Sequence, residues 1–184
     1  MPSSYDAPSE AMSDQQQEIV LRSRVFAVER MNIQLRGGEW IVQHIVRHPG
    51  AVCVLALLDD GRLVTIRNFR IATGAWMNEF CAGKLETGED PAHAAARELE
   101  EETGYQASSI ESLGMFYTSP GFTDELMHAF VARGLRPCPS RLELDERIEV
   151  VVRTVEEFEA LVRSGEISDG KTLATFLRWR LAQS

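Results

Sequence analysis

The sequence has few cysteines and no apolar run long enough to cross a membrane. Its 184 residues include three cysteines, Cys53, Cys81 and Cys138, and an odd number at irregular spacing predicts neither a disulfide framework nor a cysteine metal site. No stretch of about 18 apolar residues occurs, so we expect no transmembrane helix. Residues 1–17 lack the basic start and apolar segment of a secretory signal. We therefore expect reduced thiols in a cytoplasmic protein.

Positive charge is also in short supply. The chain has 19 Lys and Arg against 28 Asp and Glu, which gives a formal net charge of −9. Binding to nucleic acid requires basic side chains that displace counterions from phosphates, and anionic membranes attract basic surfaces. We therefore expect no nucleic-acid partner and no membrane partner. A phosphorylated small molecule remains compatible with the acidic chain, because a bound Mg²⁺ can reverse the local charge.

Length and composition are those of one globular domain, or of one domain with a small appendage. Hydrophobic residues make up 44% and charged residues 26% of the chain, values that exclude global disorder and a coiled coil. Residues 1–17 are polar and are predicted to form a disordered tail. Residues 18–47 are predicted to form a β-rich N-terminal extension, and residues 48–184 the main domain.

Apolar runs predict a largely antiparallel set of strands. Within residues 18–47, two such runs flank Gly37-Gly38 and predict a hairpin. A second hairpin is predicted at Asp59-Asp60-Gly61, after a continuous apolar run that is typical of a strand buried on both faces. The strands expected in the main domain are 51–58, 62–70, 109–119, 126–135 and 147–155.

Helices are predicted at three places. Pro91 suits the first turn of a helix and Gly104 suits its C-terminal cap, so we expect a helix between them. The segment before it, residues 83–90, is predicted to be a loop. Apolar residues at helical spacing predict further helices at 155–164 and 171–182. Strands together with a few helices indicate the α+β class.

Three carboxylates are crowded on the first of these helices. Glu98 and Glu102 are four residues apart and therefore share one face, which Glu101 borders. Carboxylates in this arrangement repel one another, and a bound hard cation such as Mg²⁺ removes the conflict. Taken alone, the same residues are explained equally well by a solvated acidic face in which Arg97 is paired locally.

The wider spacing favours the metal site. Gly83, five residues, Glu89, seven residues and then the nonapeptide RELEEETGY (97–105) resemble the Nudix hydrolase signature at every position. The resemblance covers most of the chain from about residue 20 onward. It implies an α/β/α sandwich with a mixed β-sheet in the Nudix domain (48–184). It also implies hydrolysis of a nucleoside diphosphate linked to another moiety, with Mg²⁺ or Mn²⁺ as the cofactor.

The resemblance assigns roles to the signature residues. Glu98 and Glu102 would be the main metal ligands, and the backbone carbonyl of Ala82 a third. Cys81 departs from the pattern, because proteins of this kind usually have proline there. Glycine at position 83 would let the backbone approach the metal closely.

Two further signature residues support the metal ligands. The resemblance implies that Arg97 pairs with Glu89 and thereby holds the loop against the helix. An arginine suits this task, because its planar fork fixes the geometry of a carboxylate better than lysine does. Glu101 would support the metal site or bind the metal through water.

The general base is expected outside the signature, because carboxylates that bind metal have their lone pairs occupied. The acid predicted for this role is Glu146, in the loop before the last strand. Glu143, Asp145 and Glu149 remain alternatives, because spacing does not fix the position of a carboxylate in a loop.

The substrate is predicted from segments outside the signature. Pro120, in SPGFTDE (119–125), lies fifteen residues after Tyr105, as in the ADP-ribose pyrophosphatase subgroup. The chain also resembles this subgroup, and its relatives that act on GDP-mannose, in four further segments: 67–70, 79–83, 144–151 and 165–172. The implied reaction converts ADP-ribose and water into AMP and ribose 5-phosphate. The alternatives are a hydrolase of GDP-mannose or of many nucleoside diphosphate sugars and, more remotely, a non-catalytic nucleotide-sugar sensor.

Substrate contacts are predicted for several of these segments. Arg70 would contact the diphosphate, because a guanidinium matches phosphate oxygens in pairs; the alternative is a surface salt bridge. Glu79 would lie near the substrate or the metal. Gly121 and Phe122 are predicted to line the far end of the substrate.

The N-terminal extension implies a partner subunit. In the subgroup that the chain resembles, this region exchanges between two protomers, so we expect a homodimer whose sites include residues from both chains. Trp40 could stack on the base there, or it could be a core residue.

Overall fold

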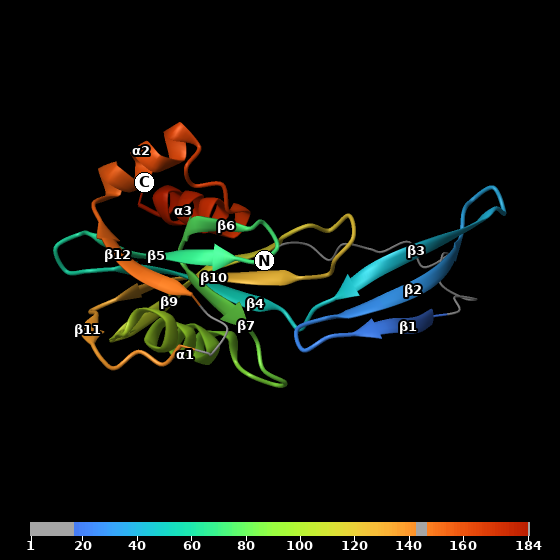
Figure 1. Ribbon diagram of the computed structural model, residues 1–184, viewed down its shortest axis with the longest axis horizontal. Coiled ribbons are helices and arrows are strands. Elements are labelled where there is room, and N and C mark those ends of the chain that lie inside the picture. Colours follow the sequence, from blue (N-terminus) through green and yellow to red (C-terminus); the bar gives the residue numbers. More distant parts are fainter. Residues whose placement is uncertain (1–16, 143–146, 184) are drawn as a thin grey trace. The chain divides into compact units, whose positions relative to one another are not determined.

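The computed structural model describes residues 17–142 and 147–183 (Figure 1). The elements in chain order are β1 (Gln17–Arg22), β2 (Ala27–Gln34), β3 (Trp40–Arg47), β4 (Ala51–Leu57), β5 (Leu63–Arg70), β6 (Ala75–Glu79), β7 (Cys81–Lys84), α1 (Pro91–Thr103), β8 (Tyr105–Gln106), β9 (Ser109–Tyr117), β10 (Leu126–Arg133), β11 (Arg136–Pro137), β12 (Ile148–Arg153), α2 (Val155–Ser164) and α3 (Gly170–Leu181). They form two compact units. Unit 1 contains residues 17–48 and 119–125, and unit 2 contains the remaining described residues.

Unit 1 is built on a three-stranded antiparallel sheet in the order β1-β2-β3. The predicted hairpin at Gly37-Gly38 is confirmed: Leu35 N donates to Glu39 O at 2.7 Å, and Gly38 has a φ of 87°, which favours glycine. The pattern before this hairpin suggested a single strand, but the structure has two, β1 and β2. A turn at residues 23–26 separates them, because the Ser23 hydroxyl accepts a hydrogen bond from Phe26 N.

The segment 119–125 belongs to the same unit. Val46 N donates to Phe122 O at 2.8 Å, and Asp124 N donates to Val46 O at 3.2 Å. Arg47 then joins this segment to the sheet, because its guanidinium binds both Glu29 of β2 and Asp124. Hydrogen bonds and ion pairs therefore attach the segment to the end of β3.

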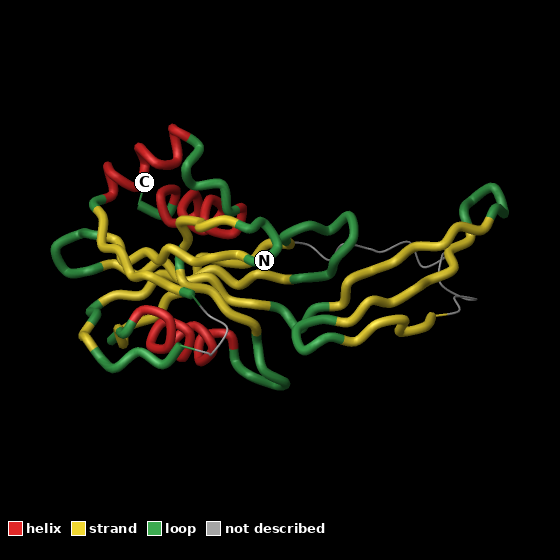
Figure 2. The backbone as a smooth tube through the Cα atoms, viewed as in Figure 1, coloured by secondary structure: helices red, strands yellow, loops and turns green. Residues whose placement is uncertain are grey.

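Unit 2 is an α/β/α sandwich, as the resemblance implied. Its main sheet has the order β12-β5-β4-β10-β9, with β6 paired to β5 and β7 paired to β4. The sheet is mixed, because β10 runs parallel to β4 whereas β9 is antiparallel to β10 and β12 to β5. Helix α1 covers one face, and α2 and α3 cover the other (Figures 1 and 2).

The core of unit 2 has two halves, one on each face of β4. Alternate residues of this strand point to opposite faces, and nearly all of them are buried, as the continuous apolar run predicted. On one side Val52 and Val54 pack with Ala94, Ala95 and Leu99 of α1. On the other side, Cys53 and Leu55 pack with a set of aromatic residues, Phe80, Phe158, Phe176 and Trp179.

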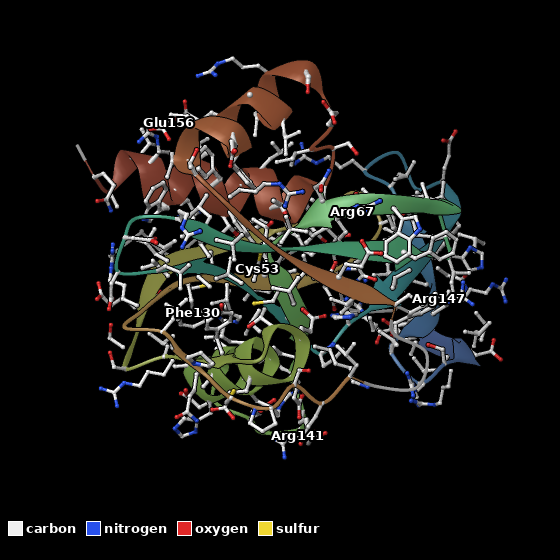
Figure 3. The ribbon with its side chains drawn as sticks, turned by 60° about the vertical axis from the view of Figure 1, so that its left-hand side comes forward. Cys53, Arg67, Phe130, Arg141, Arg147 and Glu156 are labelled. Carbon is white, nitrogen blue, oxygen red and sulfur yellow. The ribbon has the colours of Figure 1, made fainter. Side chains whose placement is uncertain are left out.

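Two of the three cysteines are core residues. Cys53 and Cys81 are buried and reduced, and Figure 3 shows Cys53 in the interior between the helical layers. Burial raises the pKa of Cys53 to about 12 and raises the pKa of Cys81 well above its ordinary value. Both therefore stay protonated at neutral pH, and a reactive or catalytic thiolate is not expected at either position.

Helix α1 begins and ends where the sequence predicted. Asp90 caps its start by accepting a hydrogen bond from Ala92 N at 2.9 Å, and Pro91 occupies the first turn. Gly104 ends the helix in the left-handed conformation, with a φ of 69°. Of the helices in the described residues, none has the length and apolar character that a membrane span requires.

Four strands were not predicted, the two-residue strands β8 and β11 and the longer strands β6 and β7. β6 has no clear alternation, and the predicted loop at 83–90 contains the last residues of β7. Both strands form because unit 2 supplies partners: β6 pairs with β5, and β7 pairs with β4 so that Ala82 lies opposite Cys53. Their pairing places the signature segment directly against the centre of the sheet.

Candidate active site

Strand β7 and helix α1 bring the signature residues into contact. Gly83 of β7 lies so close to Glu98 of α1 that a Cβ atom on Gly83 would stand 2.0 Å from the Glu98 carboxyl group. Any larger residue would displace that carboxylate. The close approach that glycine was expected to permit is therefore, in this structure, an approach of the β7 backbone to Glu98.

The predicted ligands lie around this contact. Glu102 is one turn beyond Glu98 on α1, and one of its carboxylate oxygens accepts a hydrogen bond from Ala82 N at 2.9 Å. Both glutamates are buried, at 8% and 4% exposure respectively. Ala82, Glu98 and Glu102 are thus gathered at the β7–α1 contact, which the resemblance implied.

Arg97 links the loop before α1 to the helix. Its Nε and Nη2 donate to the two carboxylate oxygens of Glu89, both at 3.0 Å, which is the pairing that the sequence predicted. Its guanidinium also binds Glu98 at 2.7 Å, Glu101 at 3.2 Å and the carbonyl of Lys84 at 3.2 Å. The hydrogen bond with Glu89 is the main cause that raises the pKa of Arg97, and the same bond lowers the pKa of Glu89.

The donor atoms fit a hard divalent cation. Within residues 17–142 and 147–183, no group of three or more His, Cys, Asp or Glu side chains is already arranged to hold a metal. The predicted set needs only two carboxylates, Glu98 and Glu102, together with a backbone oxygen. Arg97 contacts three carboxylates, and its single charge can neutralise only one of them. An all-oxygen set in a negative environment suits Mg²⁺ or Mn²⁺ rather than softer metals.

Arg70, at the end of β5, is held by Glu79, at the end of β6. Its Nε donates to one carboxylate oxygen at 2.8 Å and its Nη2 to the other at 2.5 Å. Glu79 is fully buried, whereas the Arg70 side chain is 39% exposed. The bidentate hydrogen bond with Glu79 is the largest contribution to the raised pKa of Arg70.

This pairing leaves one edge of the guanidinium for another anion. Glu79 occupies the edge formed by Nε and Nη2, and the edge formed by Nη1 and the outer N–H of Nη2 is not used by it. An arginine can bind phosphate oxygens in pairs through such an edge. The charge of Glu102 also acts on Arg70, which places this arginine within electrostatic reach of the carboxylates of α1.

A second cation on Glu79 was missed by sequence reasoning. Lys171 of α3 donates to Glu79 Oε2 at 2.5 Å and to Asp169 Oδ2 at 2.9 Å. The only signal in the sequence was that segment 165–172 resembles the same subgroup. That resemblance assigned no role to any residue of the segment. Lys171 and Glu79 are 92 positions apart, so no local pattern connects them.

The other predicted substrate residues lie in unit 1. Trp40 is 53% exposed and Phe122 is 55% exposed, and Gly121 is exposed as well. A place in the core was the alternative to a stacking role for Trp40. Its exposure shows that Trp40 is not a core residue of the described chain. Their contact with substrate remains a prediction.

The predicted base and two of its alternatives, Glu146, Glu143 and Asp145, lie outside the described residues. The third alternative, Glu149, is on β12 and pairs with Arg67 of β5 at 2.7 Å. Glu149 lies opposite Arg67 where β12 pairs with β5. Glu149 is therefore already engaged in an ion pair.

Comparisons with known proteins identify the family and the fold. The family model described as NUDIX domain matches residues 46–176. The chain is 42% identical, over 157 residues, to an ADP-ribose pyrophosphatase of Bacillus subtilis (strain 168), with 84% of this chain and 85% of that protein covered. It is 33% identical, over 171 residues, to a GDP-mannose pyrophosphatase of Salmonella typhimurium (strain LT2), with 84% and 87% covered. The solved structure of an ADP compounds hydrolase has the same fold, with a TM-score of 0.78 and 24% identity. The match covers 94% of this chain and 95% of that chain.

Proposed function

The chain belongs to the NUDIX family, and we propose that it hydrolyses ADP-ribose to AMP and ribose 5-phosphate with the help of a divalent metal. That it is a Nudix pyrophosphohydrolase follows from the family match and from its relatives. The specific substrate is supported by the ADP-ribose pyrophosphatase of Bacillus subtilis, which is 42% identical to this chain. The observation that carries the proposal is the gathering of Glu98 and Glu102 against the backbone of β7.

Two carboxylates and a backbone oxygen would hold the metal. Glu98, Glu102 and the carbonyl of Ala82 form this set. When bound there, Mg²⁺ would supply positive charge to the pyrophosphate and a water molecule of lowered pKa. Arg97 keeps the set in place, because it ties the loop at Glu89 to the first turns of α1. Glu101, which also contacts Arg97, supports the same arrangement.

Arg70 would bind the diphosphate. Glu79 orients the guanidinium from one edge, and the opposite edge presents two nitrogens to phosphate oxygens. Because Glu79 is fully buried and cannot follow the substrate, the orientation of Arg70 is set before binding. Such preorganisation reduces the cost of ordering the site when the substrate arrives.

We propose Glu146 as the general base that takes the proton of the attacking water. The reason is that Glu98 and Glu102 are committed to the metal, Arg97 binds Glu101, and Glu149 is paired with Arg67. We expect Glu146→Gln to lower kcat about a hundredfold or more, the scale of general-base catalysis, with little change in the Mg²⁺ concentration that gives half-maximal rate. A larger loss in Glu143→Gln or Asp145→Asn would move the assignment along the loop.

GDP-mannose is the second candidate substrate, because the GDP-mannose pyrophosphatase of Salmonella typhimurium is 33% identical to this chain. We would measure Mg²⁺-dependent hydrolysis of ADP-ribose beside GDP-mannose, in water labelled with ¹⁸O, and identify the products by mass. AMP and ribose 5-phosphate formed only with metal are the expected result, and the label shows which phosphorus water attacks. A higher kcat/KM for GDP-mannose would contradict the substrate, and tight binding without turnover would indicate a sensor.

We also propose that the protein is a homodimer joined through unit 1. Across β1, β2 and β3, Leu21, Val28 and Val46 lie in register on one face, and Val42 and Trp40 continue that face along β3. Leu21, Val42 and Trp40 are each about half exposed in the single chain. His44 and Arg30 lie between these residues on the same face, so the exposed apolar side chains form separate groups, and we propose that a second chain covers them. Sedimentation at the mass of a single chain, 20.6 kDa, at micromolar protein would contradict the dimer.

A further inference from the structure

The first turn of α3 is joined to β6 by a network of buried charges. Lys171 donates to Glu79 and to Asp169, and its side chain is only 13% exposed. The oxygen of Glu79 that accepts from Lys171 is Oε2, which also accepts from Nη2 of Arg70. One carboxylate oxygen is thus shared between a cation on α3 and the arginine that is proposed to bind the diphosphate.

The neighbouring residue of α3 adds a second point of attachment. The Thr172 hydroxyl donates to Asp169 Oδ2 at 2.6 Å and accepts a hydrogen bond from the backbone N–H of Phe80 at 3.1 Å. Asp169 also accepts from Thr172 N at 2.9 Å, as the N-terminal cap of the helix. Lys171 and Thr172 therefore hold two consecutive residues, the side chain of Glu79 and the backbone of Phe80. We call Arg70, Glu79, Asp169, Lys171 and Thr172 the α3 network.

The charges of the α3 network balance. Arg70 and Lys171 are cations, and Glu79 and Asp169 are anions. Burial by itself lowers the pKa of Lys171, but the charges of Glu79 and Asp169 outweigh it and the pKa is raised. Burial likewise opposes ionisation of Asp169, and Lys171 and Thr172 more than compensate, so that its pKa is lowered. Both groups are charged at neutral pH, and the loss of either leaves a buried charge without its partner.

The segment that α3 holds contributes to both parts of the proposed site. Glu79, at its start, orients Arg70. Ala82, three residues later, donates to Glu102 and provides the carbonyl proposed for the metal. A shift of Glu79 and Phe80 therefore changes the position of Arg70 first, and the position of Ala82 through the short connection between them.

We propose that Lys171 and Thr172 are positioning residues for diphosphate cleavage, acting through Glu79 and Phe80 on Arg70; this inference rests on the proposed function. Lys171 and Arg70 both donate to the shared oxygen of Glu79. Removal of Lys171 would leave Arg70 as the cation on that oxygen. The guanidinium would then be drawn toward the buried carboxylate and away from the substrate. The expected consequence is weaker substrate binding, with the metal site little changed.

The test compares Lys171→Met with the wild-type enzyme on the best substrate of the panel described above. We expect kcat/KM to fall about tenfold to a hundredfold, the range found when supporting partners of a site are removed. Most of the loss should appear in KM, and the Mg²⁺ concentration for half-maximal rate should stay within about twofold of wild type. Lys171→Arg keeps the charge and should recover part of the loss.

A matched control lies on the same helix. Arg180 of α3 pairs with Glu159 of α2 at 2.7 Å, far along the helix from the α3 network. Arg180→Met therefore removes a basic side chain and an ion pair from α3 without touching Glu79. We expect it to leave kcat/KM within about twofold of wild type, as for a surface ion pair of small energy.

A double-mutant cycle separates positioning from simple loss of stability. If Lys171 acts through Arg70, then adding Lys171→Met to Arg70→Gln should lower kcat/KM by much less than it does in wild type. Equal losses in the two backgrounds would overturn the proposal, and so would a wild-type KM in Lys171→Met. Thr172→Val should raise KM and Thr172→Ser should restore it; an equal effect of both would overturn the role of the hydroxyl.

Failure of the proposed function gives a different result. If wild-type protein turns over neither ADP-ribose nor GDP-mannose but binds them, the same variants are compared by calorimetric Kd, and an unchanged Kd in Lys171→Met overturns the inference alone. If wild-type protein neither binds nor hydrolyses these compounds, the proposed function is wrong, and the inference that rests on it falls as well.

Discussion

Replacement of Glu102 by glutamine is expected to abolish most activity and to leave the fold intact. Glutamine has the same shape and keeps an oxygen that can accept the hydrogen bond from Ala82 N, so the contact between α1 and β7 survives. What is lost is the charge that would bind the metal. Removing a residue that only supports the metal ligands lowers metal affinity or activity about 10 to 100-fold. For a residue that itself binds the metal, we therefore expect kcat to fall by more than about a hundredfold.

The measurement is kcat as a function of Mg²⁺ concentration, together with the thermal midpoint Tm. Glu100→Gln is the matched control, because it makes the same chemical change on the same helix, two positions away and on a different face. The control should keep kcat within about twofold. If Glu102→Gln reached the wild-type kcat at saturating Mg²⁺, Glu102 would not be a metal ligand.

A single methyl group at position 83 is expected to have an effect of similar size. In Gly83→Ala, the new Cβ would lie 2.0 Å from the carboxyl group of Glu98, which is an impossible contact. The group that must move is the far end of a flexible side chain, so the fold can adapt. The displaced carboxylate leaves its place beside Glu102, and misplacement by about 1 Å can cost a hundredfold in rate.

For Gly83→Ala we therefore predict a large fall in kcat with only a modest change in Tm. Gly37→Ala is the control, since Gly37 lies in a turn of unit 1 and a Cβ there meets no atom within 4 Å. It should leave both quantities nearly unchanged. A Gly83→Ala enzyme with normal kcat would mean that the position of Glu98 does not matter for the reaction.

The fold could be predicted where the information is local. Pro91 and Gly104 fix the ends of α1, because the first lacks an N–H that the helix start does not need and the second adopts a positive φ. The continuous apolar run of β4 predicted a strand buried on both faces. β6 and β7 were missed, because their residues have little strand preference of their own and become strands by pairing with β5 and β4.

The candidate site divides in the same way. The shared face of Glu98 and Glu102 follows from spacing along one helix, and the contact of Arg97 with Glu89 was implied by the resemblance to the Nudix signature. The contact of Lys171 with Glu79 follows from neither, because it forms between segments 92 positions apart and leaves no periodic pattern. Arg70 was predicted to face phosphate or to form a salt bridge; the structure shows the salt bridge and leaves a second edge of the guanidinium for phosphate.

The shared oxygen of Glu79 also connects two equilibria, the binding of an anion at Arg70 and the docking of α3 on the sheet. Coupling between two such events is reciprocal by thermodynamic necessity. If the docked helix strengthens the hold of Arg70 on a diphosphate, a bound diphosphate must stabilise the docked helix by the same free energy. The amide protons of the first turn of α3 would then exchange more slowly in the presence of substrate, although Lys171 itself touches Glu79 and Asp169 rather than the ligand.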